Sequence, residues 1–206
     1  MRKSVSQLKR CSGGSGFTLL ELLVVIAVIA ILAGILIPAT SAVRRAVVKS
    51  RTRAQFNQYA VAFEQFKAEY GFYPRMGVSG GEDSRLNLGE SGIDEVFIET
   101  FSGRQRNGSQ VSSAYAKRAN PKRISFYTFS ESEFAADESV VCGNTVKQGA
   151  IVDGFGNPNI VVVIDSDRNG VISKEFIPGD DDINANVVFY SDSGNCEDWT
   201  EVRSWN

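Results

Sequence analysis

The stretch GFTLLELLVVIAVIAILAGILIP, from Gly16 to Pro38, decides how the rest of the chain is interpreted. Its segment from Leu22 to Ile37 contains no polar side chain, and Phe17 to Leu20 lengthen the run. Together they reach the roughly 20 residues that a helix needs to cross the hydrocarbon core of a membrane. Glu21 interrupts this run, and an unpaired carboxylate in hydrocarbon costs at least about 2.5 kcal/mol. We therefore interpret Glu21 as a functional residue that needs a partner.

Charge is distributed unevenly around this run. The residues in front of it include no acid and several bases, namely Arg2, Lys3, Lys9 and Arg10. Basic residues before a hydrophobic span predict that the N-terminus stays cytoplasmic and that the rest is exported. The remaining chain is acidic, which argues against a nucleic-acid partner, because such proteins usually present a basic face.

Three segments follow from these patterns. Residues 1–16 are polar and basic and are predicted to form a leader, and residues 17–42 a transmembrane helix. Residues 43–206 are predicted to form an exported globular domain that includes the C-terminal half of the same helix. An ordinary secretory signal is the alternative, because Thr40-Ser41-Ala42 resembles a small-residue cleavage site.

The helical pattern continues beyond Pro38. The segment from Ala42 to Tyr70 contains no glycine or proline, and Gly71 and Pro74 follow as stop signals. Its aromatic residues recur at spacings of three and four, which predicts one buried stripe on an amphipathic helix. These residues are Phe56, Tyr59, Phe63, Phe66 and Tyr70.

The second half of the chain alternates between short apolar runs and turn residues. We expect a short helix at Ser91–Phe101, with Ser91 as its cap, and loops at Arg75–Gly89 and Gly103–Arg123. Strands are expected at Ile124–Phe129, Ile160–Ile164 and Val187–Tyr190, with a last short one within Trp199–Trp205. The predicted fold is α+β, a long N-terminal helix packed on a small antiparallel sheet.

Cysteine usage fits an exported protein. Cys11 lies in the predicted leader, which leaves Cys142 and Cys196 as a pair. An even number in an oxidising compartment predicts a disulfide between them. Two free, buried cysteines are the alternative.

The residues Gly16-Phe17-Thr18-Leu19-Leu20-Glu21, with Pro38 further along, carry a family resemblance. They resemble the class III leader of type IV pilins and type II secretion pseudopilins. That resemblance implies cleavage between Gly16 and Phe17 by a prepilin peptidase, methylation of the new Phe17 amine, and a role for Glu21 and Pro38 in filament assembly. It also implies a pilin-like fold, a single-pass location in the inner membrane with a periplasmic C-terminal domain, and partners: further copies, minor pseudopilins, an inner-membrane assembly platform and lipid.

Further short matches resemble the major pseudopilin of type II secretion. They are Tyr70-Gly71-Phe72-Tyr73-Pro74, Asp153-Gly154-Phe155-Gly156-Asn157-Pro158 and Ser204-Trp205-Asn206. The segment from Gly77 to Arg123 is longer than the family pattern. The resemblance implies a periplasmic filament that drives type II secretion. The alternatives are a type IV pilus subunit for adhesion, motility or DNA uptake, and a soluble exported binding module.

A calcium loop is expected after the Ile160–Ile164 strand. Oxygen donors alternate at Asp165, Asp167 and Asn169, with Gly170 at the turn and Val171 offering a carbonyl, as in the first half of an EF-hand loop. The second half departs from that pattern, because Phe176 occupies the position of the bidentate glutamate and Glu175 comes one residue early. Asp180, Asp181 and Asp182 are expected to complete the site. The major pseudopilins bind calcium in such a loop, and a plain Asx-rich turn is the alternative.

Catalytic signals are weak. The chain has no histidine, which removes the commonest general base and zinc ligand. It also has no phosphate-binding loop and no nucleophile elbow. We therefore expect no enzymatic activity.

Overall fold

The structure is a computed structural model. It describes residues 17–74, 76, 83–141, 143–179, 181–192, 196 and 200–205, without the side chains of residues 35–39 and 144. The chain forms two compact units, Met1–Arg44 and Arg45–Asn206, which are described separately. The predicted leader, residues 1–16, lies outside the described residues.

One helix, α1 (Leu19–Tyr70), contributes residues to both units. The prediction of a single long helix that ends before Gly71 is confirmed. Gly71 adopts a left-handed backbone (φ 78°), and its N–H donates to the Lys67 carbonyl at 2.7 Å. This is the usual reason for a glycine at a helix end, because only glycine adopts that conformation without strain.

In the first unit, α1 exposes apolar side chains all around its circumference. Phe17 is 76% exposed and Leu19 is 89% exposed, and most of the large apolar residues up to Leu32 are also exposed. A helix that is apolar on every side requires other apolar groups around it. No helical stretch within the described residues is both long and apolar enough to cross a membrane. The transmembrane helix at 17–42 therefore stays a prediction.

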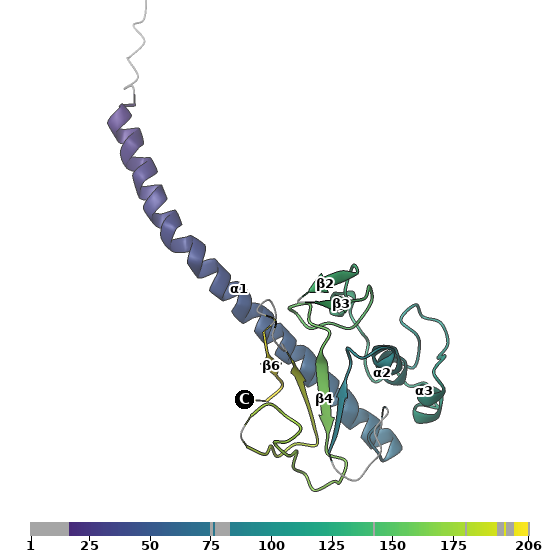
Figure 1. The fold of residues 1–206 in the computed structure, drawn as a ribbon. Helices are drawn as coiled ribbons and strands as arrows, with labels where there is room; N and C mark the ends of the chain where they lie inside the picture. The colour runs from purple at the N-terminus through teal and green to yellow at the C-terminus, as the bar shows by residue number, and fades with distance from the viewer. Residues whose placement is uncertain are drawn as a thin grey trace, which may run out of the picture. The chain divides into compact units, whose positions relative to one another are not determined.

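The second unit is built on a four-stranded antiparallel sheet in the order β1-β4-β5-β6 (Figure 1). Its strands are β1 (Ser84–Asn87), β4 (Ile160–Ile164), β5 (Val187–Ser191) and β6 (Val202–Arg203). The predictions for β4 and β5 are confirmed, and the last predicted strand is confirmed in part. All five residues of β4 are buried, as expected for an internal strand.

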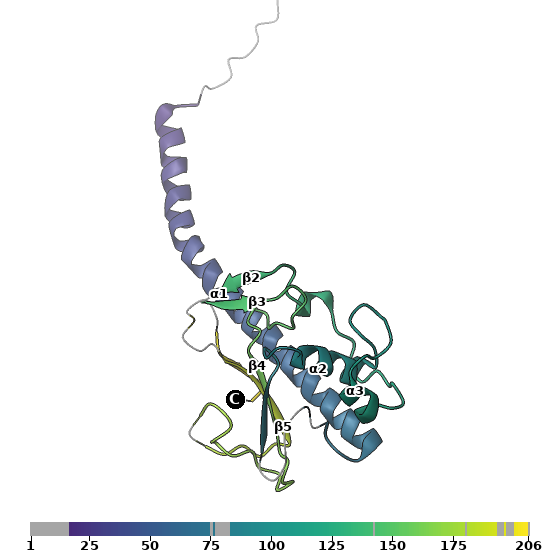
Figure 2. The same ribbon diagram turned by 45° about the vertical axis from the view of Figure 1, so that its right-hand side comes forward.

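The C-terminal half of α1 packs on one face of this sheet (Figure 2). The predicted aromatic stripe is confirmed: Phe56, Phe63 and Phe66 are fully buried. They share one core with alternate sheet residues and with the helix α2 (Ile93–Ser102). The sheet residues on this face are Leu86, Ile160, Val162, Ile164, Val187, Phe189 and Val202.

The loop between β4 and β5 covers the opposite face. Successive residues of a strand point to opposite sides of a sheet, so Val161 and Val163 point away from α1. They form a second core with Val188 and Tyr190 and with Ile172, Ile177 and Ile183 of the loop. A backbone bridge between Ile172 and Ile183 holds this loop together. The fold is therefore α+β, with helices on one face and a folded loop on the other.

Several elements differ from the sequence predictions. The strand expected at Ile124–Phe129 is absent among the described strands, because the N–H groups of Phe126 and Tyr127 both donate to the Phe101 carbonyl instead. Helix α2 begins at Ile93 after Gly92 (φ 82°), and Ser91 does not cap it. Five short elements were not predicted: β1, which lies where a loop was expected, α3 (Ala114–Ala119), η1 (Glu131–Glu133), β2 (Ser139–Val141) and β3 (Asn144–Val146).

Cys196 is disulfide-bonded. Its predicted partner, Cys142, lies outside the described residues. The pairing of these two cysteines therefore stays a prediction.

The aromatic core between α1, α2 and β5 should dominate the stability of the second unit. Phe63 lies 4.5 Å from Phe101 and 5.6 Å from Phe189, measured between ring centroids. We expect Phe63→Ala to lower the free energy of unfolding by about 3–5 kcal/mol, because it leaves a cavity among aromatic rings. Urea unfolding followed by circular dichroism measures this loss. Val61→Ala on the exposed side of the same helix is the control, with an expected change within about 0.5 kcal/mol. Equal losses for the two variants would contradict this placement of the core.

Candidate functional site

The carboxylate of Glu21 forms a local cap at the start of α1. The backbone N–H and the hydroxyl of Thr18 both donate to Glu21 Oε2 at 2.9 Å, and the Glu21 N–H donates to Thr18 Oγ1 at 3.2 Å. This reciprocal pattern is a capping box, which satisfies free N–H groups at a helix start. Among the described residues, no cation forms an ion pair with Glu21. The sequence predicted a partner for Glu21, and within the chain Thr18 provides the hydrogen bonds but no neutralising charge.

The other predicted processing residues are only partly described. Phe17 immediately precedes this cap and is largely exposed. Gly16 lies outside the described residues, and Pro38 lies within α1 with a side chain that is not among those described. The cleavage site therefore stays a prediction.

Next to the loop that follows β4, the structure places a carboxylate that the sequence did not predict as a ligand, that of Asp83. Ser84 of β1 is paired with Ile164 of β4, so the next residues outward, Asp83 and Asp165, face each other. Carboxylate oxygens of Asp83, Asp165 and Asp167 lie within 4.8 Å of one another. Asp83 and Asp165 are 7% and 2% exposed. Like charges opposite one another on neighbouring strands destabilise a sheet, so this arrangement has an electrostatic cost.

Asp165 organises the backbone of the loop. Its Oδ1 accepts from the Arg168 N–H at 2.6 Å and its Oδ2 from the Gly170 N–H at 2.8 Å. Both donors have left-handed backbones, with φ of 65° at Arg168 and 81° at Gly170. The predicted sharp turn at Gly170 is confirmed. Asp167 and Asn169 accept from the N–H groups two residues later, as in Asx turns.

Asp83 has an unsatisfied oxygen. Its Oδ2 accepts from the Ser173 N–H at 2.8 Å, whereas its buried Oδ1 has no hydrogen-bond partner. Burial raises the pKa of Asp83, and the nearby Asp167 and Asp165 raise it further. Buried polar atoms are rarely left unpaired in proteins, so this oxygen requires an explanation.

Three of the other predicted ligands lie outside this group of carboxylates. Glu175, Asp181 and Asp182 do not belong to the group formed by Asp83, Asp165 and Asp167. Asp182 instead accepts from the Lys174 N–H at 2.9 Å. Asp180 lies outside the described residues. The side-chain oxygen Oδ1 of Asn169 accepts from the Val171 N–H at 2.6 Å.

The three clustered carboxylates fit a hard divalent cation. Calcium takes oxygen ligands, and carboxylates are the commonest of its protein ligands. The unpaired Oδ1 of Asp83 is a possible metal ligand without another contact in the described structure.

The sequence analysis missed Asp83 because it expected Arg75–Gly89 to be a loop. The alternation of Arg85 and Asn87 with the buried Leu86 and Leu88 could have predicted β1.

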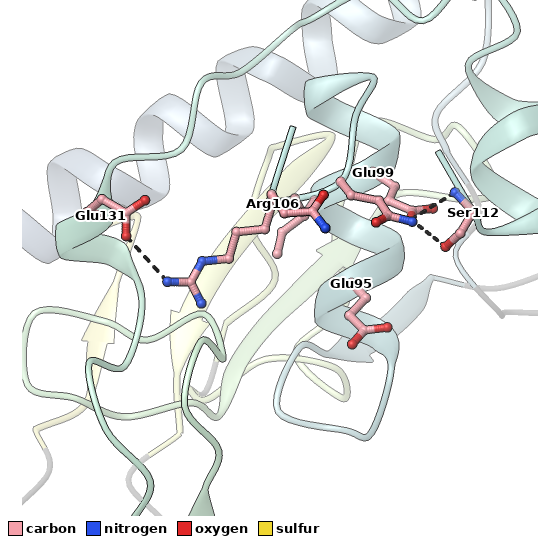
Figure 3. Close-up of a pocket in the computed structure, with 8 residues that line it drawn as sticks. Glu95, Glu99, Arg106, Ser112 and Glu131 are labelled. Carbon is pink, nitrogen blue, oxygen red and sulfur yellow. Dashed lines mark hydrogen bonds and ion pairs between the residues drawn. The ribbon is translucent and has the colours of Figure 1, made fainter. Parts of the chain in front are cut away.

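A surface cavity of about 550 Å³ lies beside α2 (Figure 3). The Arg106 side chain, which lines this cavity, forms an ion pair with Glu131 at 3.3 Å and lies over the ring of Phe134. Its buried acid, Glu99, accepts from the N–H and hydroxyl of Ser112 and from the N–H of Ser113. Burial raises the pKa of Glu99, but these hydrogen bonds outweigh burial and hold the pKa below its usual value. These groups anchor the polypeptide between α2 and α3.

The turn from Asp153 to Pro158 positions the start of β4. The Asp153 carboxylate accepts from the N–H groups of Phe155 and Asn157, at 2.8 and 3.0 Å. A Cβ on Gly154 would come within 2.7 Å of Thr52 Oγ1, so this turn packs directly on α1. The six residues that resemble the major pseudopilin therefore form a turn directly before the buried strand β4.

Comparison with known proteins identifies the N-terminal segment. Residues 12–37 match the model of the prokaryotic N-terminal methylation motif. The chain carries the signature of type IV pilin-like proteins and pseudopilins. No curated protein and no solved structure matches the chain. The matched residues include Gly16, Phe17 and Glu21, on which the resemblance was based, whereas Pro38 lies just outside the matched range.

Asp165 should stabilise the loop after β4 through its two hydrogen bonds from backbone N–H groups. In the presence of a chelator, we expect Asp165→Ala to lower the free energy of unfolding by about 1–3 kcal/mol, because the N–H groups of Arg168 and Gly170 lose their acceptor. Asp165→Asn keeps one oxygen acceptor and removes the repulsion with Asp83, so its loss should be smaller. Thermal unfolding of both variants measures the difference. An alanine variant as stable as the parent protein would contradict this role.

Proposed function

We propose that this pilin-like chain is a pseudopilin that assembles into a periplasmic filament of a type II secretion system. The observation that carries the proposal is the methylation motif at residues 12–37. The motif implies cleavage by a prepilin peptidase before Phe17 and assembly of a pilus-like filament. The role of the chain is then structural, and no catalytic activity of its own is required.

The chemistry of the first helix supports assembly through this segment. Glu21 has hydrogen bonds from Thr18 but no cation among the described residues. Cleavage before Phe17 creates an amine next to Thr18, and a neighbouring copy can offer that amine to Glu21. A buried charge without its partner is strongly destabilising, so this pairing favours one register between copies. The exposed apolar surface of α1 supplies the remaining contact area.

The inner membrane is the proposed site of the chain before assembly. The bases Arg2, Lys3, Lys9 and Arg10 precede the apolar run and favour a cytoplasmic N-terminus. The disulfide at Cys196 agrees with an oxidising compartment for the C-terminal domain. Further partners in this proposal are minor pseudopilins, an assembly platform and membrane lipid.

Type II secretion is favoured over a surface pilus by features of the second unit. The turn from Asp153 to Pro158 and the helix exit from Tyr70 to Pro74 both resemble the major pseudopilin, and both lie at structural junctions. A type IV pilus subunit remains the second candidate, because the methylation motif is common to both classes. Deletion of the gene distinguishes them: a secretion defect supports the first, and loss of surface filaments the second.

Processing and assembly can be separated by substitution. Co-expressed with a prepilin peptidase, the chain should acquire a methylated Phe17 as its N-terminus, detected by mass spectrometry. Gly16→Val should abolish cleavage, whereas Gly14→Ala should leave it intact. Glu21→Gln should be cleaved normally but lose most filament formation, because the carboxylate that pairs with the Phe17 amine is gone.

Two outcomes would contradict the proposal. An N-terminus at Val43 would mean ordinary signal cleavage after Ala42 and a soluble exported module. Filaments of normal number and length from Glu21→Gln would show that the carboxylate has no part in assembly.

We also propose that Asp83, Asp165 and Asp167 hold a calcium ion that stabilises the second unit. The unpaired, buried Oδ1 of Asp83 supports this proposal, together with the mutual repulsion of the three carboxylates. A bound divalent cation would neutralise that repulsion and use the free oxygen. Asn169 and Val171 are the nearest predicted ligands along the same loop.

Calcium should therefore raise the melting temperature. With a dissociation constant on the order of 10⁻³ M, about 10 mM calcium adds roughly 1.4 kcal/mol and about 3–6 °C. In Asp83→Asn the calcium-dependent shift should vanish, while stability in chelator is equal or higher because the repulsion is relieved. Asp137→Asn, an exposed acid outside the cluster, should keep the full shift. An unchanged melting temperature of the parent protein in calcium would exclude the site.

A further inference from the structure

The segment between α2 and η1 is basic in an otherwise acidic chain. From Gly103 to Ser130 the sequence contains no acidic residue, although the whole chain has more acids than bases. The bases in this segment are Arg104, Arg106, Lys117, Arg118, Lys122 and Arg123. We call residues 103–123, with α3 at their centre, the basic module.

Only part of this charge is neutralised within the described residues. Arg106 is paired with Glu131, and Lys122 with Glu69. The other four bases are exposed and form no ion pair with any described residue: Arg104, Lys117, Arg118 and Arg123. Isolated surface charges need no explanation, but several on one short segment create a field that attracts an acidic partner.

The basic module is anchored to the helical face of the sheet. Glu99 of α2 accepts three hydrogen bonds from Ser112 and Ser113, which fixes the start of α3 (Figure 3). The Asn120 side chain donates to the carbonyls of Thr100 and Ile124, which fixes its end. A Cβ on Gly103 would lie 2.5 Å from the Arg123 carbonyl oxygen, so the two ends of the module meet. A fixed backbone lowers the entropic cost of using these cations for recognition.

The complementary charge lies on the other face of the same unit. The loop that covers the face opposite α1 carries the exposed acids Glu175, Asp181 and Asp182, apart from Asp167 of the proposed calcium site. Only Arg168 and Lys174 offset them within that loop. We call the described residues of this segment, 165–179 and 181–186, the acidic loop. Ala119 of α3 belongs to the core on the helical face, so the basic module and the acidic loop lie on opposite faces of the sheet.

We propose that the basic module of one copy docks on the acidic loop of a second copy. This inference rests on the proposed function, because it specifies which surfaces of the second unit meet when copies polymerise. Two different surfaces that bind head to tail generate an open-ended array rather than a closed dimer. Opposite charges on the two surfaces promote encounter and fix orientation. Because every copy carries both surfaces, each basic module has one acidic loop of another copy available to it.

The test reverses charge on each surface and then on both, in the full-length chain expressed with its assembly machinery. Lys117→Glu with Arg118→Glu should reduce filaments and chemically cross-linked multimers by about tenfold, because like charges then meet. Glu175→Lys with Asp181→Lys should do the same. All four substitutions in one chain should restore assembly, because every contact again joins opposite charges. The control is Lys147→Glu. Lys147 is an exposed base directly after β3, outside both surfaces, and this variant should assemble normally.

Each result decides the inference. Normal assembly of the Lys117→Glu, Arg118→Glu variant would overturn it. Loss without rescue in the fourfold variant would also overturn it, and would indicate another acidic partner, such as DNA or anionic lipid. Rescue itself shows that the variants fold. If the parent chain is not cleaved before Phe17, the proposed function fails; if it is cleaved and assembles but the charge variants behave otherwise, only this inference fails.

Discussion

The packing of the aromatic stripe of α1 on the sheet is the interaction on which the second unit depends. Phe56 and Phe63 are fully buried against Phe189 of β5, and α2 completes the same core with Phe97 and Phe101. Burial of each aromatic ring removes a large apolar area from water, so these contacts outweigh any single hydrogen bond in the unit. Helices therefore cover one face of the four-stranded sheet. The opposite face must then be covered by something else.

That second requirement explains the length and position of the loop after β4. After β4 the chain folds back over the sheet. The loop packs on Val161 and Val163 with Ile172, Ile177 and Ile183. The apolar residues of the loop serve as a cover, and its polar residues therefore turn outward or toward the sheet edge. Asp165 lies at the junction, where it is buried beside Asp83 and accepts hydrogen bonds from the loop backbone. The acidic cluster forms where this loop leaves β4 beside the start of β1, and its electrostatic cost is the physical argument for a bound cation.

Some of this organisation was accessible from the sequence and some was not. Local signals account for three elements. A glycine ends the helix at Gly71, β-branched residues form the buried strand Ile160–Ile164, and Asp, Gly, Asn and Pro residues form the turn before that strand. Helix α3 was missed although Ser113 caps it locally, because it is only six residues long and Glu99 fixes its start from a distance. The extended segment at Ile124–Phe129 has the composition of a strand, but its N–H groups bind the end of α2 rather than a neighbouring strand.

The sequence by itself determined the N-terminal methylation signature, the long helix with its single acid Glu21 in the apolar run, and the α+β class, because each depends on residues close together in the chain. Only the tertiary structure decided that Asp83 joins Asp165 and Asp167, and that the basic and acidic segments lie on opposite faces. Both depend on which strands pair and in which register, and register is a property of contacts between distant residues. The pairing of Ser84 with Ile164 places an unexpected carboxylate in the site, and no periodicity within either segment contains that information.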